Sequence, residues 1–276
     1  MGVLGIIIQT EFGLPVYSEM FHSKLESFQM MDTSLTSGFI TAMTMFAKQY
    51  NMSIGHIKLL KDVTEPDIYG VNMIAIKKGE YLILCFVEPY IYHEIVKEKI
   101  GWIYDRVLLQ YEDDVRAGKV PTLTDEEKVY IEDILQDLYI RAIVAANKES
   151  IDSLLGAIFL KYLGIYGISI NSFDNSILYF SGSAEETLKL FLNNLGRRSS
   201  IIMENEIIDS YVSLPDFHPV RVYVTNPGVK FEIQNILTNL PEKTVSLYYY
   251  IIVEPDLDIH SIVTELIEKL NPFFSK

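Results

Sequence analysis

The residues best suited to chemistry form a pattern that occurs twice. Val87-Glu-Pro89 is followed by His93, and Val253-Glu-Pro255 is followed by His260. Each copy offers one carboxylate and one imidazole, which are possible zinc ligands. Zinc sites normally use three or four protein ligands, so we favour a structural interpretation by roughly ten to one. In that interpretation the proline ends a strand and the histidine lies in the first turn of a surface helix.

Four other segments could carry function, and each also has a structural explanation. Glu112-Asp-Asp114 could bind a cation, although charge runs after helices are usually solvated. Arg197-Arg198 could contact phosphate or act as an arginine finger; we give the finger roughly one chance in twenty against a solvated turn. Cys85 alternates with apolar neighbours in a strand pattern, which favours packing over nucleophilic reactivity. Tyr248-Tyr-Tyr250 fits an interface and a half-buried strand about equally well.

Sequence motifs of the common enzyme classes are absent. The chain has no Gly-x-x-x-x-Gly-Lys-Ser/Thr loop for nucleotide phosphates, no Gly-x-Ser-x-Gly elbow and no His-Glu-x-x-His helix. We therefore expect a protein that is not an enzyme and requires no cofactor or metal. An enzyme whose site is assembled from distant residues is the alternative that motifs cannot exclude.

Composition limits the partners. The 276 residues include 23 basic and 37 acidic ones, for a formal charge of −14. This balance disfavours nucleic acid and anionic membrane surfaces, which both require clustered cations. One cysteine, no basic leader and no apolar stretch of about 18 residues predict a cytoplasmic protein without a membrane span. Any membrane recruitment is expected to be peripheral, through partners.

The elements that must position these residues follow a repeated order. The first half predicts strands at 3–9, 14–18, 54–60, 69–76 and 81–87, and helices at 34–50, 90–111 and from 124 to about 146. The second half predicts a helix ending at Gly164, strands at 167–172, 176–181, 201–208, 220–225 and 244–253, and helices at 185–195, at 229–240 and at the C-terminus.

Matched landmarks indicate an internal repeat. Gly5 to Glu19 aligns without gaps on Gly167 to Ser181, and the spacing from the glycine to the Val-Glu-Pro tripeptide is nearly equal in both halves. We therefore predict two domains, at 1–147 and 148–276.

Residues 1–147 resemble a longin domain, similar to archaeal longin and roadblock proteins. The resemblance lies in Gly5-Ile-Ile-Ile8 with Gly13-Leu-Pro-Val-Tyr17, in Ser37-Gly-Phe-Ile-Thr-Ala-Met-Thr-Met-Phe46, and in the hairpin over 69–87. The second half is similar to a divergent copy, which departs in the helix at 229–240 and in its single C-terminal helix. The resemblance implies an α/β protein of the α+β type, a tandem of longin-like domains. Each domain would be a five-stranded, mainly antiparallel sheet with the first helix on one face and the later helices on the other.

The same resemblance implies a platform that binds or regulates a small GTPase, or another longin or roadblock protein, in vesicle trafficking. A self-associating structural subunit, a homodimer without a GTPase, is the alternative. On the helix at 34–50, one stripe is expected to face the core: Leu35, Phe39, Ala42, Met43, Phe46 and Tyr50. The expected interface residues lie off that stripe: Ser37, Ile40, Thr44 and Met45.

Overall fold

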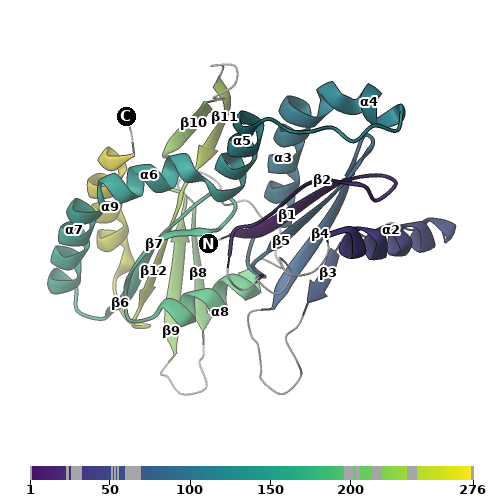
Figure 1. Cartoon of the computed structure of the whole chain (residues 1–276). Coiled ribbons are helices and arrows are strands. Elements are labelled where there is room, and N and C mark those ends of the chain that lie inside the picture. The colour runs from purple at the N-terminus through teal and green to yellow at the C-terminus, as the bar shows by residue number, and fades with distance from the viewer. Residues whose placement is uncertain are drawn as a thin grey trace. The chain divides into compact units, whose positions relative to one another are not determined.

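The structure is a computed structural model of the 276-residue chain. It describes residues 2–22, 25, 33–50, 52, 54, 56–59, 70–195, 202, 206–212, 219–234 and 241–274. The described chain forms two compact units, Met1–Gln136 and Asp137–Lys276. Both units combine antiparallel sheets with helices, which confirms the predicted α+β class (Figure 1).

Unit 1 is built on a five-stranded antiparallel sheet in the order β2-β1-β5-β4-β3. The bounds of these strands are Pro15–Met20, Val3–Thr10, Tyr81–Val87, Val71–Lys78 and His56–Leu59. Helix α2 (Thr33–Gln49) packs on one face through the buried Ile40. On the other face lie α3 (His93–Ile103) and α5 (Asp125–Gln136), with a short π-turn, a 3₁₀ turn and α4 (Glu112–Arg116) between them.

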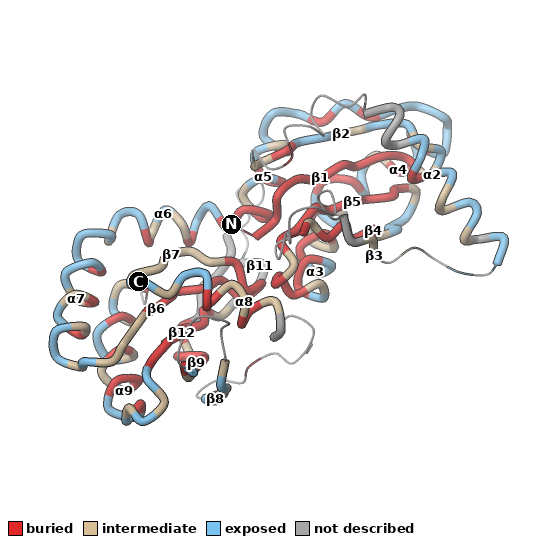
Figure 2. Tube along the Cα trace, turned by 90° about the horizontal axis from the view of Figure 1, so that it is seen from below, coloured by how far each residue is buried: buried red, intermediate tan, exposed pale blue. Residues whose placement is uncertain are grey.

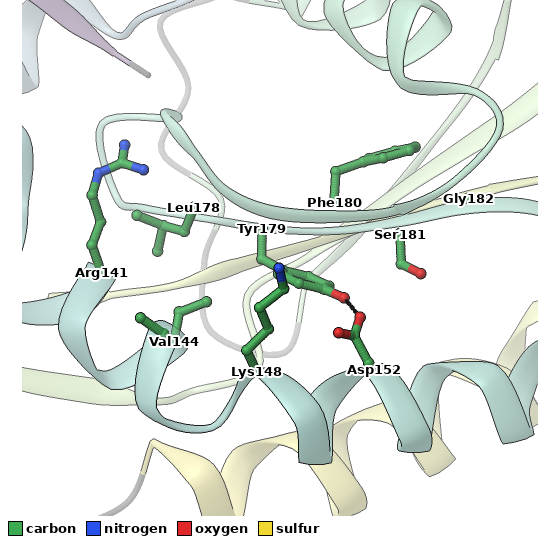
Figure 3. A pocket seen from close by; sticks show the side chains of 10 residues that line it. Arg141, Val144, Lys148, Asp152, Leu178, Tyr179, Phe180, Ser181 and Gly182 are labelled. Carbon is green, nitrogen blue, oxygen red and sulfur yellow. Dashed lines mark hydrogen bonds between the residues drawn. The ribbon is translucent and has the colours of Figure 1, made fainter.

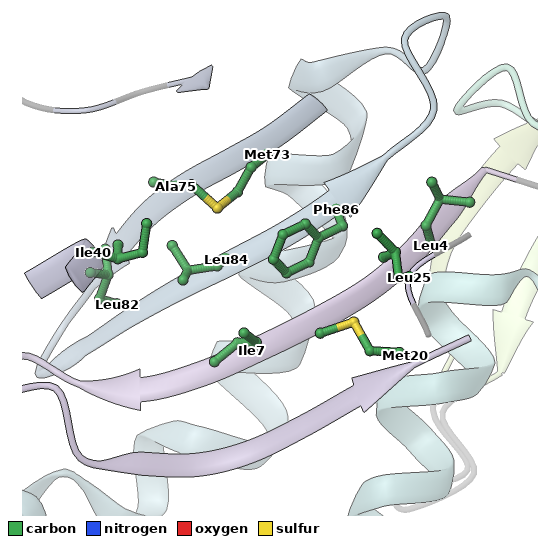
Figure 4. Packing of buried hydrophobic residues seen from close by; sticks show 10 residues of the cluster. All are labelled: Leu4, Ile7, Met20, Leu25, Ile40, Met73, Ala75, Leu82, Leu84 and Phe86. Carbon is green, nitrogen blue, oxygen red and sulfur yellow. The ribbon is translucent and has the colours of Figure 1, made fainter. Parts of the chain in front are cut away.

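The core of unit 1 on the α2 side is a continuous apolar layer (Figure 4). Alternate residues of β5 enter this layer, while Tyr81, Ile83 and Cys85 point to the opposite face. Because helices cover both faces, every residue of β5 is buried and its sequence reads as an uninterrupted apolar run (Figure 2). The members of the layer are Leu4, Ile7, Met20, Leu25, Ile40, Met73, Ala75, Leu82, Leu84 and Phe86.

Unit 2 repeats the architecture with the strand order β7-β6-β12-β9-β8. These strands span Ile177–Gly182, Ile165–Asn171, Tyr248–Val253, Val220–Thr225 and Ile207–Val212. Helix α8 (Glu185–Leu195) follows β7 and precedes β8 in the chain, as α2 follows β2 and precedes β3 in unit 1. Helices α6 (Leu138–Ala146), α7 (Lys148–Lys161) and α9 (Ile259–Leu270) complete the unit.

The two sheets share a register as well as a strand order. A β-bulge immediately precedes the matched glycines, Gly5 in β1 and Gly167 in β6. Each glycine pairs with the residue just before the Val-Glu-Pro tripeptide, Phe86 in β5 and Ile252 in β12. The spacing of these landmarks in the sequence agrees with the observed pairing. A second bulge recurs at equivalent places in the two edge hairpins, β1–β2 and β6–β7.

The hairpin turns are also equivalent. Thr10 N donates to Leu14 O at 2.8 Å in unit 1, and Ser172 N donates to Ser176 O at 2.9 Å in unit 2. Each turn contains one left-handed residue, and the equivalent φ angles are 83° at Gly13 and 77° at Asn175. Glycine and asparagine are the residues that adopt this conformation most readily.

The helix that packs against α3 and the helix that packs against α9 differ in their place in the chain order. In unit 1, α5 follows the sheet and packs against α3. In unit 2, α7 precedes the sheet and packs against α9, where Lys161 Nζ lies 2.6 Å from Glu265 Oε2. Three cationic or hydroxyl donors, of Lys161, Lys269 and Tyr162, lower the pKa of Glu265 to about 2. The layer is therefore completed in both units, although only one long helix follows the sheet in unit 2.

Two sequence predictions are corrected by the described chain. The helix predicted at 229–240 is wrong, because 230–234 form β10 (Lys230–Gln234), which pairs with β11 (Pro241–Ser246) in a separate two-stranded sheet. In the sequence, Phe231 and Ile233 alternate with polar residues, which is the pattern of a strand and which the helix prediction overlooked. In the structure, the backbone of this strand pairs with β11. The strand predicted at 244–253 is interrupted at Leu247, between β11 and β12.

The helix predicted from 124 to about 146 is also interrupted. Asp137 has a φ of 53° and separates α5 from α6. Aspartate tolerates the left-handed conformation better than most residues, and a periodicity analysis does not detect such a break. Along the chain, the second compact unit begins at this residue, whereas the sequence prediction placed the domain boundary after residue 147.

We predict opposite effects of alanine at two glycines of unit 1. Gly13→Ala should lower the free energy of unfolding by about 1–2 kcal/mol, because Ala is disfavoured at a φ of 83°. Gly38→Ala should raise it by up to about 1 kcal/mol, because Gly38 lies in helix α2 with open space around it. Urea unfolding followed by circular dichroism measures both. A gain of stability in Gly13→Ala would contradict the turn geometry.

We also predict a loss of stability at alkaline pH. Burial, followed by the charge of Glu112, raises the pKa of Tyr81 from 10.0 to about 12. Between these values the folded protein keeps a proton that the unfolded chain releases, so stability falls as pH rises through the window. Tyr81→Phe removes this titration, so the free energy of unfolding should decline less steeply with pH. The variant should also be less stable at neutral pH, because it loses the hydrogen bond from Tyr81 Oη to Leu108 O. Urea midpoints from pH 7 to 12 test this. The exposed Tyr139→Phe is the control and should leave the decline unchanged.

Candidate protein-interaction surface

Helix α2 contacts the sheet along a narrow line. Ile40 is 3% exposed and joins the core layer, and Met43 packs partly against it. Gln9 of β1 donates from Nε2 to Thr41 Oγ1 at 3.0 Å, which ties the helix to the centre of the sheet. These contacts fix the rotation of the helix about its axis.

This rotation turns a large apolar surface to the outside. Phe39, Met45, Phe46 and Tyr50 are each more than 60% exposed, and the rings of Phe46 and Tyr50 lie 5.1 Å apart. Small or uncharged residues fill the spaces between them. We call this surface the α2 outer face, and its members are Gly38, Phe39, Ala42, Met45, Phe46, Gln49 and Tyr50. These members are the exposed residues among the side chains described at 38–50, and they are all uncharged.

Several residues of this helix lie on the opposite side from the one predicted. Phe39, Phe46 and Tyr50 were expected in the core and are exposed. Among the expected interface residues, Ile40 is buried in the core, and Thr44 is half-buried with its hydroxyl donating to Ile40 O at 2.9 Å.

Met45, another of the expected interface residues, is 62% exposed. Ser37 lies in α2, and its side chain is outside the described residues. The helix is apolar on more than one side, so hydrophobic periodicity alone could not select the side that faces the sheet.

The equivalent helix of unit 2 has a different outer surface. Helix α8 buries Leu188, Phe191 and Leu192 against its own sheet, and Phe191 contacts Tyr250 edge to face. Its exposed residues in the described part are Glu185 and Glu186. The exposed residues described for α8 are therefore charged, whereas those of the α2 outer face are uncharged.

The repeated glutamate and histidine residues have structural surroundings. Tyr90 Oη donates to Glu88, and His93 is the first residue of α3. Asp258 caps α9 by accepting from His260 N at 3.2 Å. Within the described chain, no group of three or more His, Cys, Asp or Glu side chains could hold a metal ion.

The acidic run at 112–114 is engaged in ion pairs. Arg116 contacts Glu112 at 2.7 Å and Glu80 at 2.9 Å, which links α4 to the β4–β5 turn. Lys119 Nζ lies 2.8 Å from Asp114. These contacts give the run a role in holding the turn.

The remaining candidates are buried or lie outside the described chain. Burial raises the pKa of the Cys85 thiol, which keeps it protonated and unreactive at neutral pH. Tyr249 donates to Asn271 Oδ1 at 2.9 Å and Tyr250 to Asn175 Oδ1 at 2.6 Å, so both rings belong to the core. Arg197-Arg198 falls outside the described residues.

No known family model and no curated protein matches this sequence. None of the helices in the described part of the chain combines the length and hydrophobicity needed to cross a bilayer.

The two sides of α2 predict a contrast in stability. Ile40→Ala should lower the free energy of unfolding by about 2–5 kcal/mol, because it leaves a cavity in the core layer. Phe46→Ala should change it by less than about 0.5 kcal/mol, because the ring is 62% exposed. Chemical unfolding of both variants tests which side of α2 faces the sheet. Equal losses in the two variants would contradict it.

Proposed function

We propose that this protein is a non-catalytic interaction platform, built from two longin-like domains, that binds a small GTPase through the α2 outer face. The exposure of Phe39, Met45, Phe46 and Tyr50 carries the proposal. Contiguous exposed apolar surfaces on otherwise polar proteins commonly mark interaction sites. Exposed aromatic rings are also the side chains that contribute most to binding energy at protein interfaces.

The comparison between the two units supports a functional origin for this surface. Helices α2 and α8 occupy equivalent places, and the exposed residues described for α8 are acidic. An apolar outer surface, which would favour aggregation, is best explained by a partner. The class of partner comes from the longin resemblance, which implies a small GTPase in a trafficking-type complex. We propose a cytoplasmic location, with any membrane recruitment through that partner.

One observation favours a second candidate, self-association. The chain has a net charge of −14, so most surfaces of two copies repel each other, yet the described side chains of the α2 outer face carry no charge. Two copies could therefore meet through this face without bringing like charges together. In that case the protein is a homodimeric structural subunit with no GTPase partner.

The test is affinity capture from the protein's own cell extract in the presence of GDP or a non-hydrolysable GTP analogue. We expect nucleotide-dependent recovery of a small GTPase, and a loss of about tenfold or more in Phe46→Glu combined with Tyr50→Glu. The matched control is Leu160→Glu on α7, which changes an apolar side chain that is 84% exposed. It should leave recovery unchanged.

Light scattering after size-exclusion chromatography separates the two candidates. A dimer of the intact protein that becomes monomeric in the Phe46→Glu, Tyr50→Glu variant, with no GTPase recovered, would replace the GTPase proposal with self-association. A monomer that recovers no GTPase with either nucleotide would overturn both.

A further inference from the structure

Strand β7 forms an edge of the unit 2 sheet, and helix α6 contacts it. The strand pairs only with β6 among the described strands. Its sequence, Ile177-Leu-Tyr-Phe-Ser-Gly182, contains no charged residue and no proline. Natural edge strands usually carry such residues, because a bare edge recruits other strands. The equivalent strand of unit 1, β2, carries both Pro15 and Glu19.

A cavity of about 660 Å³ runs along this edge (Figure 3). One wall consists of five consecutive residues of β7, Leu178 to Gly182, and the other consists of α6 and α7. Successive side chains of a strand point to opposite faces of the sheet. A cavity that touches five successive residues therefore borders the strand backbone as well as its side chains.

Two cations line the helical wall of this cavity. Arg141 of α6 is half-buried and donates from Nη1 to Ile177 O at 3.3 Å, at the start of β7. Lys148 of α7 is exposed and makes no ion pair with any residue that the structure describes. The one carboxylate of the lining, Asp152, accepts the hydroxyl of Tyr179. The cavity therefore offers positive charge on a protein whose formal charge is −14.

The equivalent edge of unit 1 has different charged neighbours. Tyr17 of β2 occupies the position that Tyr179 has in β7, since each pairs with the isoleucine before the second bulge. Burial raises the pKa of both tyrosines to about 12, and nearby carboxylates add to the effect: Glu19 and Glu132 at Tyr17, and Asp152 at Tyr179. The edges differ in that Arg141 and Lys148 line the cavity beside β7 together with Asp152.

We propose that β7 is a docking site for an extended acidic peptide of a partner protein. The peptide adds to the sheet as a further antiparallel or parallel strand, and its carboxylates contact Arg141 and Lys148. Main-chain hydrogen bonds would supply affinity, and the two cations would select acidic side chains. This site lies in unit 2 and goes beyond the interaction proposed for α2.

The probe is a short, blocked and fluorescently labelled peptide of alternating valine and glutamate, titrated with the intact protein and followed by fluorescence anisotropy. We expect saturable binding in the micromolar to millimolar range that is weakened about tenfold or more by Arg141→Gln combined with Lys148→Gln. The control combines Lys119→Gln with Lys128→Gln, which removes two exposed cations of unit 1 and should leave binding unchanged.

Two further peptides test the mode of binding. The peptide with glutamine in place of glutamate should bind more weakly, because it lacks the carboxylates that contact the two cations. The peptide with alternate backbone amides N-methylated should also bind more weakly, because it cannot pair with β7 as a strand. Binding that survives N-methylation, or free glutamate and inorganic phosphate that compete as well as the peptide does, would overturn strand addition in favour of a simple anion site. Absence of saturable binding up to millimolar peptide would overturn the proposal altogether. None of these outcomes depends on the α2 outer face.

Discussion

The antiparallel pairing of the first strand of each sheet with its last strand, β1 with β5 and β6 with β12, determines the position of the other elements. These central strands are buried on both faces, so helices must cover the sheet on both sides. Slipping a strand by one residue would exchange its two faces. The bulges before Gly5 and Gly167 set the register, and the lack of a Cβ allows Met20 and Phe180 of the edge strands to pack over these glycines.

The same framework accepts two different surfaces at one position. Helices α2 and α8 both place apolar side chains against the sheet, but α2 presents aromatic rings to the outside and α8 presents carboxylates. The core contacts of Ile40 and of Leu188 stabilise the fold and leave the outer side of each helix unconstrained. The function proposed for this protein accordingly rests on the outward residues of α2 rather than on the fold itself.

The route of the chain also creates a difference between the units. The helix beside α3 follows the sheet of unit 1, whereas the helix beside α9 precedes the sheet of unit 2. Because α6 and α7 lead into β6, they bring Arg141 and Lys148 alongside β7. The two units can in this way share a strand order and a register, yet differ in the charged residues beside their edge strands.

The sequence by itself determined the strand and helix order of the first half, the Val-Glu-Pro strand ends and the equivalence of the two halves, because each depends on local periodicity and spacing. Tertiary structure decided three features that local patterns leave open. The side of α2 that faces the sheet depends on the packing of Ile40 in the core layer and on the bond from Gln9 to Thr41, since the helix is apolar on more than one side. The hairpin of β10 and β11 depends on hydrogen bonds between the two strands. The position of Arg141 and Lys148 beside β7 depends on the packing of α6 and α7, which precede that strand in the sequence.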